Sequence, residues 1–226
     1  QIFRFFKMED GSFDIILKDR VINVYEKNNY LYVSSNNEDD LKSVVMNYFD
    51  LDNDYSKINE YLLKQDKKLD DAINFSKGLM MIKQDPFETI MEYIISANNS
   101  VPSIASALNN IALKYGKKVM FNNKEYYLFP QYKDLKDVKE SDLRECKVGF
   151  RDKYLKNIID KLNNNELDLG SFYSMDTKEA LDKLMENIGI GPKVASCILL
   201  FAYQKYDVFP VDTWVKKVMK TKYNIE

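Results

Sequence analysis

The order of apolar and polar residues divides the chain into two parts. From Ile2 to Ser34, the turn signals MEDG, KD and EKNN separate four short β-type runs, IFRFF, SFDIIL, RVINVY and YLYVS. Short runs rich in β-branched and aromatic residues, joined by such turns, predict an antiparallel sheet of consecutive strands. After Asn36 the apolar residues recur at helical spacing up to the end of the chain. That second pattern predicts helices.

The two patterns together predict an α+β fold, with an N-terminal antiparallel β-sheet followed by a mainly α-helical core. We expect the sheet in residues 1–38 and the helical core in residues 39–226. No run approaches the 18 apolar residues typical of a membrane span, and the first residues lack the order of a signal peptide. We therefore expect a protein that acts inside the cell and away from membranes, and we also expect it to be a monomer.

The ends of two central helices are marked clearly. Asp85 and Pro86 form a cap and first-turn pair before FETIMEYIISA, and a second helix is expected from Pro102 to Gly116. The link NNSV between them predicts a tight corner. Further helices are expected at LKSVVMNYF, YSKINEYLL, SDLREC, KYLKNIIDKL, TKEALDKLMEN, KVASCILLFAY and VDTWVKKVMK.

A glycine-rich link joins two of the later helices. Only residues 188–192, IGIGP, separate TKEALDKLMEN from KVASCILLFAY, which predicts a helix-hairpin-helix. Gly189 and Gly191 permit positive φ and the close approach of another backbone, and amides at the following helix start can hold a phosphate oxygen. The hairpin therefore suits a DNA backbone, with an ordinary turn between helices as the alternative.

Lys193 lies at the start of the second hairpin helix, directly before the mostly apolar run VASCILLFA. The helix-end field and desolvation both favour the neutral amine, which is the nucleophilic form of lysine. The alternative is a lysine whose stem packs locally while its head group reaches water or a phosphate.

Composition restricts the chemistry that such a lysine could join. The chain of 226 residues contains no histidine and two cysteines, which excludes Ser-His-Asp schemes, the common histidine metal sites and four-thiolate clusters. We expect no metal and no cofactor. The formal net charge of −2 does not suggest a nucleic-acid partner, but the 33 lysines and arginines can still gather on one face.

Asp212 provides an acid nineteen residues after Lys193, in the segment FPVDTW. A carboxylate at this apparent helix start could simply cap the helix. It could also face Lys193, so that a nucleophilic amine and a carboxylate able to stabilise positive charge or move protons would work without histidine.

These motifs give the chain a resemblance to the helix-hairpin-helix DNA glycosylases, and within them to the 8-oxoguanine DNA glycosylase/lyases. The segments that carry it occur in the family's order: QIFRF, YFDLD, KQDPFETIMEYIISANNS, FP, VGFRDKY, GIGPKVASC and PVDTW. The resemblance implies that Lys193 attacks the sugar C1′ and that Asp212 is the essential aspartate. Such an enzyme would flip 8-oxoguanine out of duplex DNA, excise it through a Schiff base and β-eliminate the 3′ phosphate.

The resemblance also implies roles in base flipping. Asn98, with Asn99 beside it, would enter the space left by the flipped nucleotide, although an Asn pair between helices is also turn-forming. Phe150 would act as a wedge between bases, and the neighbouring Arg151 would grip the estranged base. Cys197 and Phe201 would line the damaged-base pocket. The alternative for Phe150, Cys197 and Phe201 is an ordinary place in the core.

The sequence departs from the family pattern at several points. Ser103 stands where many relatives have an arginine that reads the opposite cytosine, and Trp214 replaces a histidine that contacts phosphate. We expect the sheet to be incomplete at its start and the helical core to lack its C-terminal end. Three alternatives stay open: a related lyase for a different damaged base, a non-catalytic helix-hairpin-helix DNA-binding module, and a helical protein-interaction scaffold.

Overall fold

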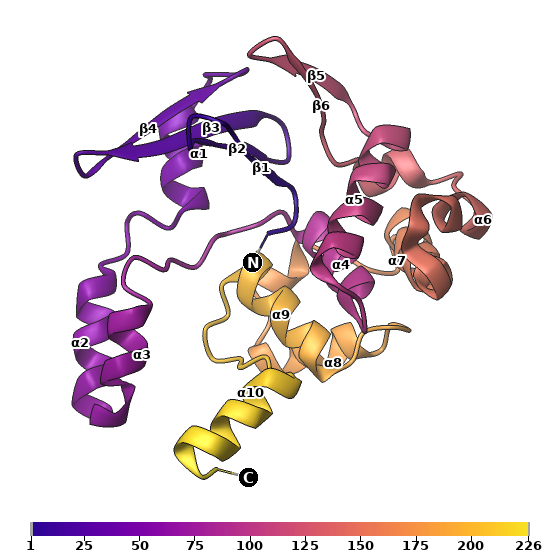
Figure 1. The fold of residues 1–226 in the computed structure, drawn as a ribbon. Helices are drawn as coiled ribbons and strands as arrows, with labels where there is room; N and C mark the ends of the chain where they lie inside the picture. The colour runs from indigo at the N-terminus through magenta and orange to yellow at the C-terminus, as the bar shows by residue number, and fades with distance from the viewer. Residues whose placement is uncertain (1, 226) are drawn as a thin grey trace.

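The computed structural model describes residues 2–225 and confirms the α+β class. Four strands pair antiparallel in chain order, as the turn signals predicted (Figure 1). Their bounds are β1 (Phe5–Lys7), β2 (Phe13–Ile16), β3 (Val21–Lys27) and β4 (Tyr30–Ser35). The register places Val24 opposite both Phe13 and Val33, so that apolar residues of three strands share one face.

Helices make up most of the chain after the sheet (Figure 1). Between residues 36 and 115 they are α1 (Leu41–Tyr48), α2 (Tyr55–Gln65), α3 (Asp70–Phe75), α4 (Pro86–Ser96) and α5 (Val101–Tyr115). The later ones are α6 (Glu140–Leu143), α7 (Asp152–Asn163), α8 (Thr177–Met185), α9 (Pro192–Tyr203) and α10 (Thr213–Val218). In the part of the chain that is described, no helix is long and apolar enough to cross a membrane.

Helix punctuation works as the sequence suggested for α4 and α5. The carboxylate of Asp85 accepts hydrogen bonds from the amides of Phe87 and Glu88, both at 3.1 Å, and Pro86 occupies the first turn of α4. The side chain of Ser100 caps α5 in the same manner. Capping therefore sets where both central helices begin.

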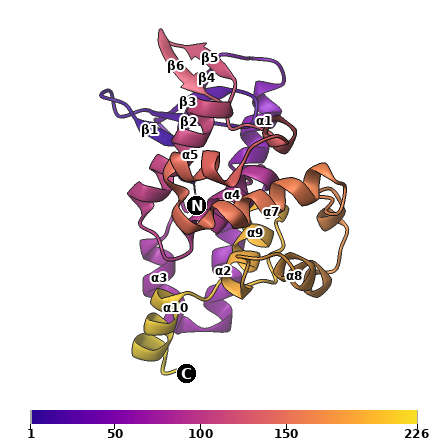
Figure 2. The same ribbon diagram turned by 90° about the vertical axis from the view of Figure 1, so that its right-hand side faces the viewer.

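A second β-element was not predicted. Strands β5 (Lys118–Phe121) and β6 (Lys124–Tyr127) form a hairpin inside the part that we expected to be helical. Asn122 and Asn123 form its turn with φ of 48° and 59°, a conformation that asparagine tolerates better than most residues. Figure 2 shows the hairpin beside the N-terminal sheet. The division between residues 38 and 39 stays a prediction.

The hairpin packs on the face of the sheet opposite to α1. Ile15, Ile22 and Val24 cluster with Tyr48 of α1 on one face, while Ile16 and Val21 cluster with buried residues of the hairpin segment, Phe121, Tyr126 and Leu128, on the other. The hydroxyl of Tyr126 donates a hydrogen bond to the buried carboxylate of Asp14, which also accepts one from the Asn23 side chain at 2.7 Å. A polar contact thus fixes the hairpin on an apolar surface.

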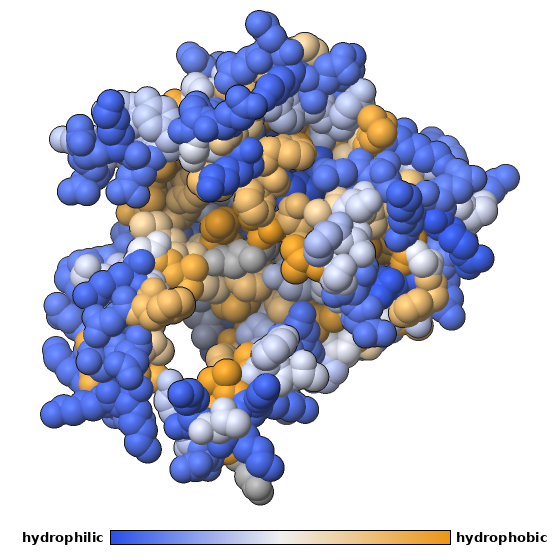
Figure 3. Space-filling model, in the orientation of Figure 1, coloured by the Kyte–Doolittle hydropathy of each residue, from blue (hydrophilic) through white to orange (hydrophobic). Residues whose placement is uncertain are grey.

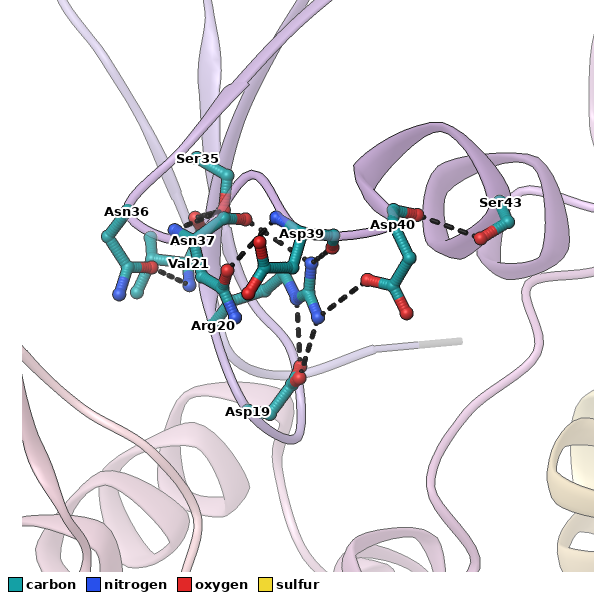
Figure 4. A network of polar contacts seen from close by, with 9 residues as sticks. All are labelled: Asp19, Arg20, Val21, Ser35, Asn36, Asn37, Asp39, Asp40 and Ser43. Carbon is teal, nitrogen blue, oxygen red and sulfur yellow. Dashed lines mark hydrogen bonds and ion pairs between the residues drawn. The ribbon is translucent and has the colours of Figure 1, made fainter.

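Arg20 ties the turn after β2 to the segment that leads into α1 (Figure 4). Its side chain is buried, donates to the carbonyls of Asn37 and Asp39 at 3.2 Å and 2.5 Å, and pairs with Asp40 at 3.1 Å. Its hydrogen bonds to Asp19 are the main cause that lowers the pKa of that carboxyl. The guanidinium therefore determines how the chain leaves the sheet.

Arg4 links the start of the sheet to the helical core. Its buried guanidinium pairs with Glu88 of α4 at 2.9 Å, donates to Asn109 of α5 at 3.3 Å and donates to the carbonyl of Tyr127. Burial raises the pKa of Glu88 in spite of this partner. The sheet, α4, α5 and β6 consequently meet at one buried cation.

The largest apolar cluster lies among α4, α5, α7, α8 and α9. Residues Ile90, Met91, Ile94 and Ile95 of α4 have no exposed surface, or essentially none. Apolar residues also gather in a hollow on the face drawn in Figure 3, between the sheet, the α2 and α3 pair and the helical core. Burial of this much apolar area is the main term that holds the helices together.

We predict that Tyr126→Phe lowers the free energy of unfolding by about 1–3 kcal/mol, since it leaves a buried carboxylate short of one donor. Chemical denaturation measured by circular dichroism tests this. Tyr30→Phe is the matched control because Tyr30 is 70% exposed, and its effect should stay within about 0.5 kcal/mol. Equal stability of both variants would show that the Asp14 contact does not hold the hairpin.

Candidate active site

Lys193 lies at the point where two buried helices meet. It is the second residue of α9, whose residues Ala195, Ile198 and Leu199 have no exposed surface. The half-buried side chain reaches across to α4, where its Nζ lies 5.2 Å from the centroid of the Tyr93 ring. A ring face attracts a cation at this distance. The amine therefore lies over an aromatic ring at the edge of the core.

Cys197 and Phe201 follow Lys193 along the same helix at successive turns. Cys197 is 4% exposed, and burial is the largest cause that raises the pKa of its thiol, while Lys193 opposes the rise. Phe201 stacks on Tyr93 with centroids 5.7 Å apart and an interplanar angle of 9°. One face of α9 thus presents an amine, a thiol and an aromatic ring next to Tyr93.

Asp212 stands at the start of α10, where it caps the helix, and its catalytic role stays a prediction. Its Oδ1 accepts a hydrogen bond from the amide of Val215 at 2.8 Å, which is helix capping. Its charge is also one of the smaller causes that raise the pKa of the Cys197 thiol, the largest being burial. Within residues 2–225, Asp212 and Lys193 make no direct ion pair at 4.0 Å or less.

The loop between α9 and α10 is fastened to the start of α8. Lys205 Nζ donates to the carbonyl of Met175 at 2.6 Å, and Thr177 Oγ1 donates to Asp207 at 2.9 Å. Val208 is buried in the main core. These contacts hold the loop that leads from α9 into α10.

The hairpin between α8 and α9 depends on contacts from α7. Gly189 has a φ of 86°, and a Cβ on it would lie 2.6 Å from the ring of Tyr154. The buried side chain of Asn187 donates to the carbonyls of Lys183 and Leu184 at 3.1 Å and 3.0 Å and accepts from Lys161 Nζ at 2.8 Å. Position 189 therefore requires glycine, both because of the positive φ and because a side chain would clash with Tyr154.

Gly191 differs from Gly189. A Cβ on Gly191 would meet nothing within 4 Å, and its φ of −94° suits any residue. It precedes the first turn of α9, where backbone amides have no partner inside the helix. The space in front of Gly191 is therefore open to another molecule.

The residues expected to flip the base form a second group, after the end of α4 and before the start of α7. Asn98 is exposed and has a φ of 50°, whereas Asn99 uses its side-chain amide to donate to the carbonyl of Ile95 at 3.1 Å. Phe150 is 54% exposed and meets Tyr154 edge-on, with centroids 6.1 Å apart. Arg151 is 6% exposed, and its guanidinium donates to the carbonyls of Ala97 and Asn98.

The two departures from the family pattern have simple structural surroundings. Ser103 lies in the first turn of α5, where its hydroxyl and amide both bond to the capping Ser100 hydroxyl, at 2.9 Å and 3.4 Å. Trp214 is 70% exposed on α10, with Lys217 Nζ 5.5 Å from its ring centroid. In the described chain no group of three Cys, Asp or Glu residues is arranged to hold a metal ion.

Sequence reasoning missed Tyr93, Tyr154 and Asn187. Tyr93 is one of the buried residues of α4, and only the packing of α9 brings it to Lys193. Tyr154 falls within the motif VGFRDKY, four residues after Phe150, which is one helical turn. That spacing was an available signal that the wedge and Tyr154 share a face.

Comparison with known proteins identifies the family. Residues 1–90 match the model described as 8-oxoguanine DNA glycosylase, N-terminal domain, and residues 91–226 match that of the HhH-GPD superfamily base excision DNA repair proteins. The chain belongs to the HhH-GPD superfamily. The resemblance to the 8-oxoguanine DNA glycosylase/lyases noted in its sequence is confirmed.

Relatives in this superfamily include a probable N-glycosylase/DNA lyase of Methanothermobacter thermautotrophicus, 32% identical over 79% of the chain and 63% of the relative. The N-glycosylase/DNA lyase of Saccharomyces cerevisiae is 29% identical over 84% of the chain and 53% of the relative. The chain thus spans between half and two thirds of the length of these two HhH-GPD relatives.

Solved structures agree with this assignment. The 8-oxoguanine glycosylase/lyase of Clostridium acetobutylicum, in complex with double-stranded DNA containing cytosine opposite to 8-oxoG, is 41% identical. The superposition covers 98% of this chain and 76% of that one, with a TM-score of 0.94. A 3-methyladenine DNA glycosylase from Archaeoglobus fulgidus, 23% identical with a TM-score of 0.78, has a similar fold.

The two hairpin glycines make a matched pair of variants. We predict that Gly189→Ala lowers the free energy of unfolding by about 2 kcal/mol or more, from the positive φ and the contact with Tyr154. Gly191→Ala should lower the free energy of unfolding by about 1 kcal/mol at most. It should nevertheless weaken binding to duplex DNA, because the new methyl group would occupy the open space through which a DNA backbone would approach the turn. Denaturation and fluorescence anisotropy measure the two effects. Unchanged DNA affinity in Gly191→Ala would show that DNA does not approach this turn.

Proposed function

We propose that the chain is a bifunctional DNA N-glycosylase and AP lyase that flips 8-oxoguanine out of duplex DNA and excises it through a Schiff base on Lys193. The observation that carries the proposal is the place of Lys193, over Tyr93 and beside Cys197, at the first turn of a hairpin helix. The lyase names of the relatives and the DNA complex of the Clostridium acetobutylicum enzyme support it.

In this proposal the neutral Lys193 amine attacks the sugar C1′, and the bond between C1′ and the base breaks with its electron pair leaving on the base. Opening of the C1′–O4′ bond and loss of the amine proton then form the Schiff base. The iminium acidifies the C2′ proton, and removal of that proton expels the 3′ phosphate. Lys193, at the N-terminus of the buried helix α9, would thus serve first as the nucleophile and then, as the iminium, as the electron sink.

Asp212 would stabilise the positive charge that develops on the sugar and on the amine. Its Oδ1 already accepts from Val215, which fixes the carboxylate at a helix start, and its negative charge contributes to the raised pKa of the Cys197 thiol. Capping and catalysis would then be two uses of one side chain.

The remaining site residues would bind the DNA. Gly189 and Gly191 would let the hairpin approach a phosphate. Asn98 would occupy the vacated space, with Asn99 beside it, and exposed Phe150 would unstack the neighbouring base step. Cys197 and Phe201 would contact the extruded base. The partner would be double-stranded DNA containing 8-oxoguanine. A monomer would bind it inside the cell, in the cytoplasm and nucleoid or in a nucleus.

Ser103 bears on the choice of the opposite base. A short hydroxyl that bonds to Ser100 lacks the two-pronged donor set with which an arginine reads a base. We propose weak discrimination among bases opposite the lesion.

A related lyase for a different damaged base is the second candidate function, because a DNA-3-methyladenine glycosylase of Bacillus subtilis is 25% identical over 77% of the chain. Excision assays on a panel of damaged bases separate the two.

Borohydride trapping tests the proposed chemistry. Incubation with 8-oxoguanine duplex in borohydride should give a covalent protein–DNA complex, because the reductant converts the imine into a stable amine. Lys193→Gln should give none. Trapping of Lys193→Gln at the parent's level would remove Lys193 from the mechanism, and a protein that binds the duplex without trapping or excision would be a non-catalytic module.

Asp212→Asn separates capping from catalysis, because asparagine caps a helix about as well as aspartate. We predict unchanged stability and a fall of about a hundredfold or more in the single-turnover rate of excision. Asp176→Asn is the matched control: Asp176 caps α8 by accepting from the Lys178 amide at 2.9 Å. Equal excision by the Asp212 and Asp176 variants would reduce Asp212 to a cap.

A further inference from the structure

Arg151 is a buried cation whose donors are engaged by backbone oxygens. It precedes α7 and is 6% exposed. Its Nε donates to the carbonyl of Ala97 at 3.0 Å, its Nη2 to the same oxygen and to that of Asn98 at 3.0 Å, and its Nη1 to that of Val148 at 3.2 Å. Burial lowers its pKa. No carboxylate pairs with it within residues 2–225, so carbonyl dipoles balance the charge.

Two of these carbonyls belong to a helix end that needs a partner. α4 ends at Ser96, and Ala97 is its C-cap residue. The last carbonyls of a helix lack hydrogen bonds within it and carry the negative end of the helix dipole, which a cation stabilises. The guanidinium of Arg151, more than fifty residues away in sequence, therefore does the work that a C-terminal capping group usually does.

The next residue makes this contact relevant to DNA. Asn98 has a φ of 50°, a left-handed conformation that costs free energy for any residue with a side chain. The hydrogen bond from Arg151 to its carbonyl favours the peptide orientation that accompanies this φ. The Asn98 side chain is thereby left exposed, where it could enter a duplex.

The same guanidinium also contacts the wedge. Its Cζ lies 4.4 Å from the centroid of the Phe150 ring, a cation–π distance. Phe150 in turn meets Tyr154, whose ring lies against Gly189 of the hairpin. The segment at the start of α7 thus connects the loop of residues 97–100, called the Asn98 loop below, with the wedge residue Phe150 and with the hairpin of residues 188–192.

We propose that Arg151 is a positioning residue that holds the Asn98 loop in its left-handed conformation before DNA binds. The proposal rests on the proposed function, because Asn98 matters as the residue that fills the space of the flipped nucleotide. This task in the free protein adds to the grip on the estranged base that the resemblance implies, since four of the five N–H groups of the guanidinium already donate to backbone carbonyls before DNA binds.

Hydrogen exchange on the free protein provides the first test and needs no DNA. In Arg151→Met the amides of residues 94–100 should exchange about tenfold faster or more, since hydrogen bonds to a charged group are lost. Arg151→Lys, which keeps one cationic donor, should lie between that variant and the parent. Lys153→Met, which removes an exposed cation from the same turn, is the matched control and should exchange like the parent. Parent-like exchange in Arg151→Met would overturn the proposal.

A double-mutant cycle with Asn98→Ala provides the second test, through the single-turnover rate of 8-oxoguanine excision. If Arg151 acts through Asn98, most of the rate loss caused by Arg151→Met disappears in the Asn98→Ala background. Losses that multiply would mean that Arg151 contacts DNA independently, and would contradict the proposal. A parent protein without excision activity would refute the proposed function alone, because the exchange result stands without it.

Discussion

The packing of α9 against α4 is the constraint on which the candidate site depends. Both helices bury most of their residues, the apolar ones in a single cluster, and close-packed interiors leave little room for a helix to rotate or slide. Because the orientation of α9 is fixed, its second residue must lie over Tyr93 and its sixth must be buried beneath. The position of the Lys193 amine is therefore a consequence of core packing.

The surfaces proposed to meet DNA are likewise held from inside the molecule. The left-handed residue after α4 is supported by a buried arginine, and the positive φ of Gly189 is accommodated against the ring of Tyr154. Both supports lie at the start of α7, Arg151 directly before its first residue and Tyr154 in its first turn. Preformed loops lose less conformational freedom when a ligand binds. This arrangement would suit the proposed function, in which binding free energy has to offset the cost of flipping a nucleotide out of the duplex.

Local patterns predicted much of the architecture. Strand and helix periods, the caps at Asp85 and Pro86, and the glycine link are all properties of neighbouring residues, and the structure contains the corresponding elements. The β5–β6 hairpin was missed because the segments KVMF and KEYY are short and contain several charged residues. The hairpin is stabilised by burial against a sheet about a hundred residues away in sequence, which a local pattern does not reveal. The two asparagines between them were the signal.

Contacts between distant segments could not be predicted in this way. The sequence does not reveal that the donors of Arg151 face the carbonyls of Ala97 and Asn98, or that Tyr93 lies under Lys193. The catalytic roles of Lys193 and Asp212 came from a resemblance joined to chemical reasoning, and they remain proposals that the geometry supports.

The most direct measurement is the location of the sugar in the reduced covalent complex, by proteolysis and mass spectrometry of the modified peptide. Our account predicts that the modification lies on Lys193 alone, within the peptide that begins the hairpin helix. Modification of another lysine, or of the terminal amine, would contradict it, because the core packing of α9 would then have no part in placing the nucleophile.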